Sequence, residues 1–393
     1  MKILVICQYY YPEPFRLNDI CEELVNQGHE VTVVTGLPNY PMGEIYNGYK
    51  NGEKRNEIVN GVKVHRCSII PRKKGALYRF LNYYSYVISS SFYIGKVKHE
   101  YDVVFVYQLS PVMMAYAGIK YAKKWGKRMV IYCLDIWPES LLVGKIKKGS
   151  AIYNLLHRTS AKIYKAADKI LISSRAFSAY FKSEFGIKET EYLPQYAEEL
   201  YNPEECKKEP NGCIDLMFAG NIGEAQSVKT IIRAAVKCKY LDNLRWHIVG
   251  DGVELENCKM LADNLKAPVI FHGRKPTKEM PKYYSMADAM IVTMEKNDAL
   301  SRTLPGKIQS YMAAGKPILG AIGGETQKII KESNCGFCCD AEDVEGFIEV
   351  VKKFYSADKK EIEKASFDYS NTHFRRDLFM RRICEELKTV GDY

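Results

Sequence analysis

The chain has 393 residues, of which 47% are hydrophobic and 26% are charged, and its net charge is +10 at pH 7. This length exceeds one compact core, so we predict two domains of roughly 200 residues each, and the composition excludes a chain unable to fold. The chain opens as a strand, "MKILVICQYY", without the pattern of a signal peptide. Twelve scattered cysteines fit reduced thiols in a cytoplasmic protein.

Charge is unevenly distributed along the chain. Residues 1–190 contain 28 Lys and Arg against 15 Asp and Glu, a net +13, whereas the remainder contains 29 against 32, a net −3. This asymmetry predicts two domains with different partners.

Strands and helices are predicted to alternate through the first half. The strands are "KILVIC", "EVTVVT", "DVVFVY", "MVIYC" and "KILIS", each an apolar run of parallel-strand length. Helices are predicted over residues 15–27 and 112–125, each closed by a glycine.

A polar stretch with three prolines then precedes a second run of alternating elements. We predict a linker over residues 191–213, followed by the strands "DLMFAG", "LRWHIVG", "PVIFHG", "AMIVTM" and "PILGAI". Two consecutive doubly wound α/β domains are the simplest interpretation, residues 1–190 and 214–370. "CGFCC" lacks the second ligand pair of a metal or redox motif, so Cys335, Cys338 and Cys339 are interpreted as a small strand.

Glycine-rich turns follow the strands of the second half. Gly220 and Gly223 in "FAGNIGEAQS" allow a close approach, either to another part of the protein or to a ligand such as phosphate. Further glycines or cations follow other strands: Gly250 and Gly252, Gly273 with Arg274, Lys307, and "GAIGGE". Because these strand ends share one edge of a parallel sheet, the loops converge, and Arg274 and Lys307 are the cations able to face a diphosphate.

These motifs resemble the GT4 family of glycosyltransferases, closest to its bacterial capsule and O-antigen branch. The resemblance rests on "GNIGEAQ", "GRKPTKEMPKYYSMADAMIVT", "LPGKIQSYMAAGKPI", "YYPEP", "TGLPNYP" and "LDIWPES", and it covers about residues 2–385. It implies a GT-B fold: two facing Rossmann-like domains, the first for an acceptor and the second for a nucleotide-sugar. A C-terminal helix within residues 371–393 is expected to pack on the first domain.

The resemblance is partial at the donor site. The family's diphosphate lysine corresponds to Gln226, and the second glutamate of its pair corresponds to Ser310, with Arg302 eight residues earlier. Hydroxyl contacts are therefore assigned to Gln309, Ser310 and Glu325. The full predicted donor site is Gly220, Asn221, Gly223, Gln226, Gly250, Gly252, Gly273, Arg274, Lys307, Gln309, Ser310 and Glu325.

The predicted chemistry is transfer of a sugar from a nucleoside diphosphate sugar, with retention of configuration as the resemblance implies. Arg274, Lys307 and loop amides would stabilise charge growing on the departing diphosphate. No Asp-x-Asp pair occurs in the chain, so neither a metal nor another cofactor is expected.

Catalytic candidates in the first domain are Asp135 and Glu139, which follow a buried strand in "LDIWPES". The alternative for Asp135 is a helix cap or an ion pair. The predicted acceptor site consists of Glu13, Arg16, Asn18 and Trp137.

Residues 71–98 contain six Lys and Arg, seven aromatic residues and no acid. One helical face suits the core and consists of Leu77, Leu81, Tyr84, Ile88 and Phe92. Two tyrosines and three cations do not fit that face: Tyr83, Tyr86, Arg72, Lys73 and Lys74. We interpret the latter as contacts with an anionic membrane surface, next to a polyprenyl-pyrophosphate-linked saccharide acceptor. A solvated face is the alternative.

The predicted protein is thus a cytoplasmic enzyme, peripheral on the inner face of the cell membrane, that uses a UDP-sugar. Two alternatives remain open: a UDP-sugar 2-epimerase of GT-B fold, and a non-catalytic basic protein that binds nucleic acid. No nucleic-acid motif occurs in the chain, so no such partner is expected.

Overall fold

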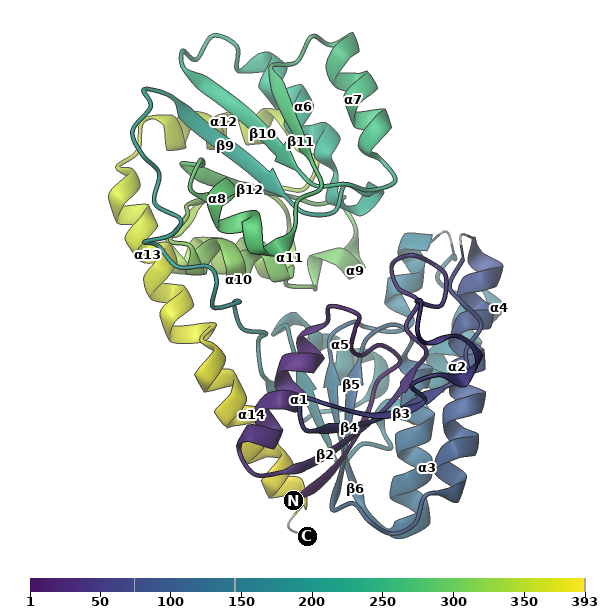
Figure 1. Ribbon diagram of the computed structural model, residues 1–393. Helices are drawn as coiled ribbons and strands as arrows, with labels where there is room; N and C mark the ends of the chain where they lie inside the picture. Colours follow the sequence, from purple (N-terminus) through teal and green to yellow (C-terminus); the bar gives the residue numbers. More distant parts are fainter. Residues whose placement is uncertain (74, 145, 392–393) are drawn as a thin grey trace. The chain divides into compact units, whose positions relative to one another are not determined.

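The structure is a computed structural model that describes residues 1–391 apart from 74 and 145 (Figure 1). The chain divides into two compact units. Unit 1 comprises Met1–Leu193 together with the chain from Met380 onward, and unit 2 comprises Pro194–Phe379. The predicted linker is therefore split, and most of it belongs to unit 2.

Unit 1 contains an eight-stranded sheet in the order β3-β4-β2-β1-β5-β6-β7-β8. Neighbouring strands are parallel except for the antiparallel pair β3–β4. Five of these strands match the predicted ones, whereas the β3–β4 hairpin was not predicted. The strands are β1 (Lys2–Ile6), β2 (Glu30–Gly36), β3 (Asn56–Val59), β4 (Val62–Cys67), β5 (Val103–Gln108), β6 (Arg128–Cys133), β7 (Lys169–Ile172) and β8 (Glu191–Tyr192).

The helices of unit 1 connect these strands, as in a doubly wound fold. The predicted helix after residue 112 begins as a 3-10 turn, and Gly126 ends it in the left-handed conformation with φ 62°. The helical segments are α1 (Arg16–Asn26), η1 (Lys50–Gly52), α2 (Ala76–Lys96), η2 (Val112–Ala115), α3 (Tyr116–Trp125), η3 (Glu139–Gly144), α4 (Ala151–Tyr164) and α5 (Ala176–Phe185).

Unit 2 contains a six-stranded parallel sheet in the order β11-β10-β9-β12-β13-β14. Its carboxyl ends share one edge, as predicted, and "CGFCC" contributes the small strand β14. The strand order changes direction at β9, which lies between β10 and β12, and α/β sheets bind ligands at such switch points. The strands are β9 (Ile214–Ala219), β10 (Leu244–Val249), β11 (Val269–Gly273), β12 (Ala289–Thr293), β13 (Ile318–Ala321) and β14 (Gly336–Cys339).

Helices cover both faces of this sheet, because strand residues alternate between two apolar clusters. Leu216 and Phe218 pack on one face with α6, α7 and α12, and Met217 and Ala219 pack on the other with α8, α10 and α11. The helical segments are η4 (Glu224–Gln226), α6 (Val228–Lys237), α7 (Leu255–Asn264), η5 (Thr277–Glu279), α8 (Met280–Tyr284), α9 (Asp298–Ser301), α10 (Gly306–Ala313), α11 (Gly324–Ser333), α12 (Val344–Tyr355), α13 (Lys359–His373) and α14 (Arg376–Gly391).

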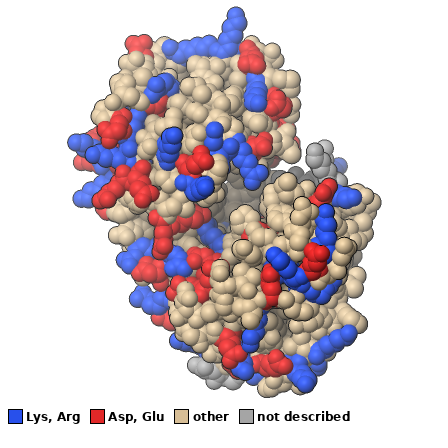
Figure 2. All heavy atoms as spheres, viewed as in Figure 1, with Lys and Arg blue, Asp and Glu red and all other residues tan. Residues whose placement is uncertain are grey.

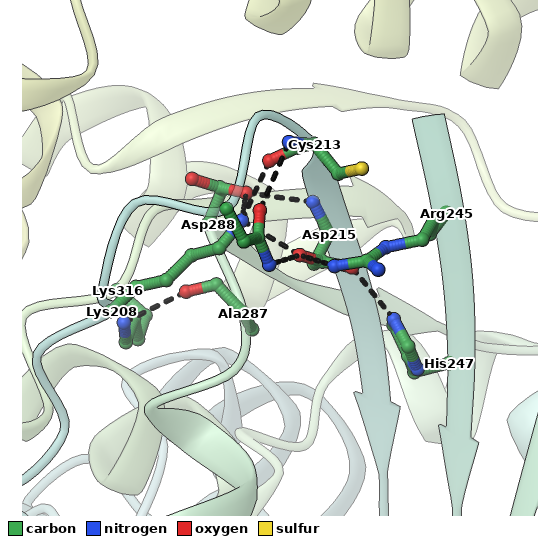
Figure 3. Close-up of polar contacts among 9 residues, drawn as sticks. Lys208, Cys213, Asp215, Arg245, His247, Ala287, Asp288 and Lys316 are labelled. Atoms are coloured by element: carbon green, nitrogen blue, oxygen red, sulfur yellow. Dashed lines mark hydrogen bonds and ion pairs between the residues drawn. The ribbon is translucent and has the colours of Figure 1, made fainter. Parts of the chain in front are cut away.

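A polar cluster fastens residues 194–213 to the amino end of the unit 2 sheet (Figure 3). The Lys208 ammonium donates to the carbonyl of Cys213 and pairs with Asp215, each at 2.7 Å, and it also pairs with Asp288. Burial alone would raise the pKa of Asp215, but hydrogen bonds from His247, Arg245 and Lys208 hold it well below its usual range. This cluster lies at the amino ends of the strands, opposite the carboxyl edge of the sheet, and it joins Lys208 to β9 and to Asp288 just before β12.

The C-terminal helix packs on unit 1, as predicted. From Met380 onward, α14 belongs to that unit, where Arg382 pairs with Glu191 at 2.5 Å and Glu386 pairs with Lys169. These contacts hold α14 against β7 and β8.

Candidate functional site

The loops after β9 and β10 pack backbone against backbone. A Cβ atom on Gly250 would lie 1.8 Å from the Gly220 carbonyl oxygen, and one on Gly252 would lie 2.3 Å from that of Ile222. The loops are also joined by hydrogen bonds from Gly220 to Val249 and from Ile222 to Asp251, both 2.9 Å. Several predicted donor-site glycines are thus required by contacts within the protein, whatever the loops bind.

Gln226, the residue at the position of the family lysine, closes its own loop. Its Oε1 accepts hydrogen bonds from the Asn221 side chain at 3.0 Å and from the Gly223 amide at 3.1 Å. The loop is also tied to the end of β12, because Thr293 donates to the Gln226 carbonyl at 2.6 Å. Gln226 therefore shapes the loop without supplying positive charge.

Lys307 brings a cation to this loop from α10. Tyr311, one turn later on the same helix face, donates to the Ala219 carbonyl at 2.8 Å and so fixes α10 against the end of β9. The Lys307 Nζ lies 3.9 Å from the centroid of the Phe218 ring, and a Cβ on Gly220 would come within 2.8 Å of it. Gly220 thus provides the space that this ammonium occupies.

The Lys307 ammonium is buried and has no hydrogen-bond partner among the described residues. Burial lowers the pKa of Lys307 to about 7, because the charged form loses hydration without gaining a carboxylate. An unsatisfied buried ammonium is costly, and an anion bound beside it would relieve that cost. At the switch point of the sheet, it is a ready contact for a phosphate.

Arg274, the second predicted cation, is exposed directly after β11. It follows Gly273, whose carbonyl accepts a hydrogen bond from the Gly250 amide at 2.9 Å. Loops after β9, β10 and β11 are therefore linked in sequence along the edge, and Arg274 extends from the last of them.

Gln309, predicted to contact hydroxyl groups of the donor, is buried within unit 2. The residue is 1% exposed, and in the orientation that satisfies both ends its amide donates to Gly306 at 2.9 Å and to Pro305 at 3.0 Å. It stabilises the start of α10 and thereby the position of Lys307. Glu325, also predicted at the donor site, is buried in the first turn of α11.

Ser310 has an unpredicted acidic neighbour. Its hydroxyl donates to Glu198 Oε2 at 2.8 Å. Glu198 belongs to the segment predicted as a linker, so no local motif indicated its position. A carboxylate thus lies next to the position where the resemblance placed a glutamate.

Asp135 lies at the carboxyl end of β6 in unit 1, as predicted. The Ser110 hydroxyl donates to its carboxylate, and Trp137 Nε1 donates to Ser110 at 2.8 Å. Burial raises the pKa of Asp135 to about 6, although the hydrogen bond from Ser110 opposes the shift. A carboxylate with a pKa near neutrality can orient or accept a proton from a substrate hydroxyl.

Trp137 and Glu139, predicted at the acceptor and catalytic sites, are both buried in unit 1. Trp137 is 3% exposed, and its indole N–H positions the Ser110 hydroxyl. Glu139 is 2% exposed and accepts a hydrogen bond from Tyr153 at 2.7 Å. Its carboxylate faces α4 inside unit 1, and its catalytic role stays a prediction.

Glu13, predicted at the acceptor site, is fully buried and holds the turn after β2. Its Oε1 accepts from the amides of Asn39 at 2.9 Å and Tyr40 at 2.6 Å, while its Oε2 has no hydrogen-bond partner among the described residues. Burial raises the pKa of Glu13 to about 7. Asn18 donates to the Glu13 carbonyl at 2.8 Å, and Arg16 begins α1 beside it.

In the basic segment of residues 71–98, the face that points into unit 1 is not the one predicted to do so. Tyr83 and Tyr86 are 6% and 0% exposed, and Tyr86 donates to the Val34 carbonyl at 2.8 Å. Their hydroxyls are accommodated inside unit 1, so these rings do not contact a membrane. Arg72 is half-buried and Lys73 is exposed, whereas Lys74 lies outside the described residues.

The outward face of α2 is apolar. Leu77, Ile88 and Phe92, which had been assigned to the core, are 67%, 69% and 66% exposed, and Phe80 is 54% exposed. Ile152 and Leu155 of α4 are similarly exposed, at 63% and 65%. None of the helices in the described part of the chain combines the length and apolarity needed to cross a membrane. On the face shown in Figure 2, basic and acidic side chains are interspersed within each unit.

Comparison with known families identifies both halves of the chain. Residues 16–194 match the family model described as Glycosyltransferase Family 4, and residues 205–366 match Glycosyl transferases group 1. WbjE of Pseudomonas aeruginosa, named a probable glycosyltransferase, is 26% identical over 63% of this chain and 64% of its own length, which is less than two thirds. WcaI of Escherichia coli strain K12, named for colanic acid biosynthesis, is 25% identical over 80% of this chain and 82% of its own.

Solved structures share the fold. Sucrose-phosphate synthase from Thermosynechococcus elongatus has a TM-score of 0.78 at 14% identity, covering 99% of this chain and 98% of that one. Anabaena HepE, solved with UDP-glucose, has a TM-score of 0.70 at 14% identity, covering 99% and 100%. With two Rossmann-like units and both family models matched, the chain belongs to glycosyltransferase family 4 and has the GT-B fold.

Proposed function

We propose that the protein transfers a sugar from a UDP-sugar to a saccharide carried on a lipid diphosphate, during assembly of a surface polysaccharide. The observation that carries this proposal is the buried Lys307 ammonium, which has no hydrogen-bond partner among the described residues and lies at the switch point of unit 2. HepE, a structural relative, was solved with UDP-glucose, and WcaI is named for polysaccharide synthesis.

The proposed reaction replaces one bond at the anomeric carbon. The acceptor hydroxyl oxygen forms a bond to that carbon while the bond to the diphosphate oxygen breaks, and the leaving phosphate takes the hydroxyl proton. Attack occurs on the face that the diphosphate leaves, which gives retention. Lys307 and Arg274 stabilise the charge that grows on the diphosphate, more strongly in the transition state than before it.

Other residues orient the two substrates. Asp135 accepts a hydrogen bond from the acceptor hydroxyl, and the carboxylate of Glu198 with the Ser310 hydroxyl contacts hydroxyl groups of the donor. The chain has no Asp-x-Asp pair to hold a metal on the diphosphate, so we propose a metal-independent reaction. The exposed apolar residues of α2 support a peripheral position on the inner face of the cell membrane.

The experiment that tests this function is calorimetry of the purified protein against UDP-, GDP- and dTDP-sugars, followed by transfer to a short isoprenyl-diphosphate saccharide. We expect tightest binding of a UDP-sugar, transfer with retention, and no loss of activity in EDTA. Lys307→Gln should abolish the contribution of the diphosphate to the binding of the nucleotide-sugar. Lys316→Gln is a matched control, because Lys316 is also buried in unit 2 but donates to Ala287 at the amino end of the sheet.

Two outcomes would contradict the proposal. Turnover of the donor to an epimeric sugar without acceptor would indicate a 2-epimerase. Salt-sensitive binding to DNA without binding of any nucleotide-sugar would indicate a nucleic-acid-binding protein.

A further inference from the structure

Unit 1 contains a basic cavity of about 420 Å³ between two loops at neighbouring strand ends. The turn after β2 and the segment from β4 into α2 supply its walls. Three of the lining residues are cations and one is an acid, so the cavity is net positive: Pro41, Met42, Gly43, Glu44, Arg72, Lys73, Gly75 and Arg79. Its volume falls in the range of small-molecule sites, roughly 300–1,000 Å³.

The cavity walls are fixed by buried polar contacts. Asn39 is fully buried; its Oδ1 accepts the Arg72 amide at 2.8 Å, and its carbonyl accepts the Gly43 amide at 2.7 Å. Gly43 has φ +77°, and a Cβ there would lie 3.0 Å from the Arg72 carbonyl oxygen. The buried Glu13 carboxylate accepts hydrogen bonds from the same turn, so the two loops are joined by buried contacts.

The Arg72 side chain is held in place before any ligand binds. Its guanidinium lies 5.7 Å from the ring centroids of both Tyr40 and Tyr83, and it donates to the Tyr9 hydroxyl at 3.3 Å. Such restraint reduces the side-chain entropy lost when an anion binds. Arg72 can therefore act as a pre-organised anion contact.

Tyr83 connects this cavity to the candidate catalytic carboxylate. Its ring packs edge-on against Trp137 at 6.4 Å, and Trp137 holds Ser110 against Asp135. Burial raises the pKa of Tyr83, while the charges of Arg72, Arg79 and Asp135 all act on its hydroxyl. The cavity and Asp135 thus flank the same tyrosine.

Apolar side chains adjoin the other side of the cavity. Leu77, Tyr78 and Phe80 are 67%, 39% and 54% exposed in the first turns of α2, around the cavity residue Arg79. The Asp135 carboxylate, the cations of the cavity and the apolar surface of α2 follow one another in this order. A ligand with an anionic group between a saccharide and a hydrocarbon chain matches it. An acidic sugar alone has no apolar group that could contact this surface.

We propose that this cavity binds the diphosphate of an isoprenyl-linked acceptor, with the hydrocarbon chain over the first turns of α2 and the saccharide towards Asp135. The identity of the acceptor rests on the proposed function, whereas the site itself rests on the cavity. Arg72, Lys73 and Arg79 hold the diphosphate oxygens through charge-assisted hydrogen bonds.

Calorimetry on the full chain with farnesyl diphosphate, farnesol and inorganic pyrophosphate tests the site without any donor. Farnesyl diphosphate should bind more tightly than either partial ligand, because it fills both the basic cavity and the apolar surface. Lys73→Gln and Arg79→Gln should each weaken its binding about tenfold, the effect of one charge-assisted contact. Lys96→Gln, which removes one charge at the other end of α2, should leave binding unchanged.

A vesicle arm separates this ligand from an anionic membrane surface. Neutral vesicles that carry an isoprenyl diphosphate should bind the wild-type protein, and Arg79→Gln should weaken that binding. If the variants weaken binding only to anionic vesicles and leave farnesyl diphosphate unaffected, the inference is overturned. UDP binding, measured on the same variants, should be unchanged. If the variants bind UDP but the acceptor site fails its test, the donor half of the proposed function still holds.

Discussion

The carboxyl edges of the two sheets are built by different means. The edge of unit 2 consists of glycine loops in backbone contact, with one buried ammonium, Lys307, and one exposed cation, Arg274. The edge of unit 1 combines buried carboxylates and aromatic rings with a basic cavity at the ends of β2 and β4, and its Asp135 and Glu13 are shifted towards neutral pKa values. The first arrangement suits the departing diphosphate of a donor, and in the second the Asp135 carboxylate suits a hydroxyl that must be oriented.

This contrast predicts that charge removal in unit 2 has the largest effect on turnover. Lys307→Gln should reduce kcat/KM by roughly a hundredfold or more, because one pre-organised donor to a developing anion contributes about 3 kcal/mol. Steady-state kinetics with a UDP-sugar checks this value. Lys316→Gln serves as the folded control. A near-normal rate in Lys307→Gln would show that the Lys307 charge does not stabilise the departing diphosphate.

A change at Asp135 should be smaller and should leave the donor untouched. Asp135→Asn should lower kcat about tenfold to a hundredfold by misorienting the acceptor hydroxyl, with UDP affinity unchanged. The carboxylate has a pKa of about 6, so wild-type activity should fall as the pH drops below that value, and the variant should lack this acid limb. If Asp135 is only structural, thermal stability will fall while the rate and its pH profile persist.

Ser110 should act through Asp135 with a still smaller effect. Its hydrogen bond lowers the pKa of Asp135, so Ser110→Ala should raise that pKa and move the acid limb of activity to higher pH. We expect a few-fold loss near pH 6 and a nearly normal rate near pH 8. A uniform loss across the pH range would argue against this positioning role.

Glu139 should have the smallest effect on chemistry. Glu139→Ala should cost about 1–3 kcal/mol of stability, because it leaves the Tyr153 hydroxyl without its buried acceptor, and it should retain the wild-type kcat. Denaturant unfolding measures the cost. Tyr153→Phe in the same background should recover part of the lost stability. A large fall in kcat in Glu139→Ala would instead support the predicted catalytic role of Glu139.

The sequence was more informative about unit 2 than about unit 1, for a physical reason. Glycines and cations at successive strand ends lie on one sheet edge by topology alone, so the positions of Gly220, Gly250 and Lys307 followed from local patterns. Lys307 also lies one helical turn before Tyr311, which anchors α10 to β9. Glu198 was missed because its contact with Ser310 depends on how a non-repetitive segment docks.

In unit 1 the failures concern side chains whose direction depends on tertiary packing. Helix α2 is apolar on more than one face, so its period did not reveal that Tyr83 and Tyr86 point inward while Leu77 and Phe92 point outward. Three predicted site residues, Glu13, Trp137 and Glu139, also have contacts with turns and neighbouring helices that no local pattern indicated.

Proton uptake on UDP binding shows whether the Lys307 ammonium contacts the diphosphate of the donor. In the ligand-free protein Lys307 has a pKa of about 7, and a bound diphosphate should raise it well above 7.5, so the complex should take up roughly 0.8 proton at pH 7.5. Calorimetry in buffers of different ionisation enthalpy measures this number. Uptake that vanishes in Lys307→Gln agrees with the account, whereas binding without proton uptake, or equal uptake in the variant, contradicts it.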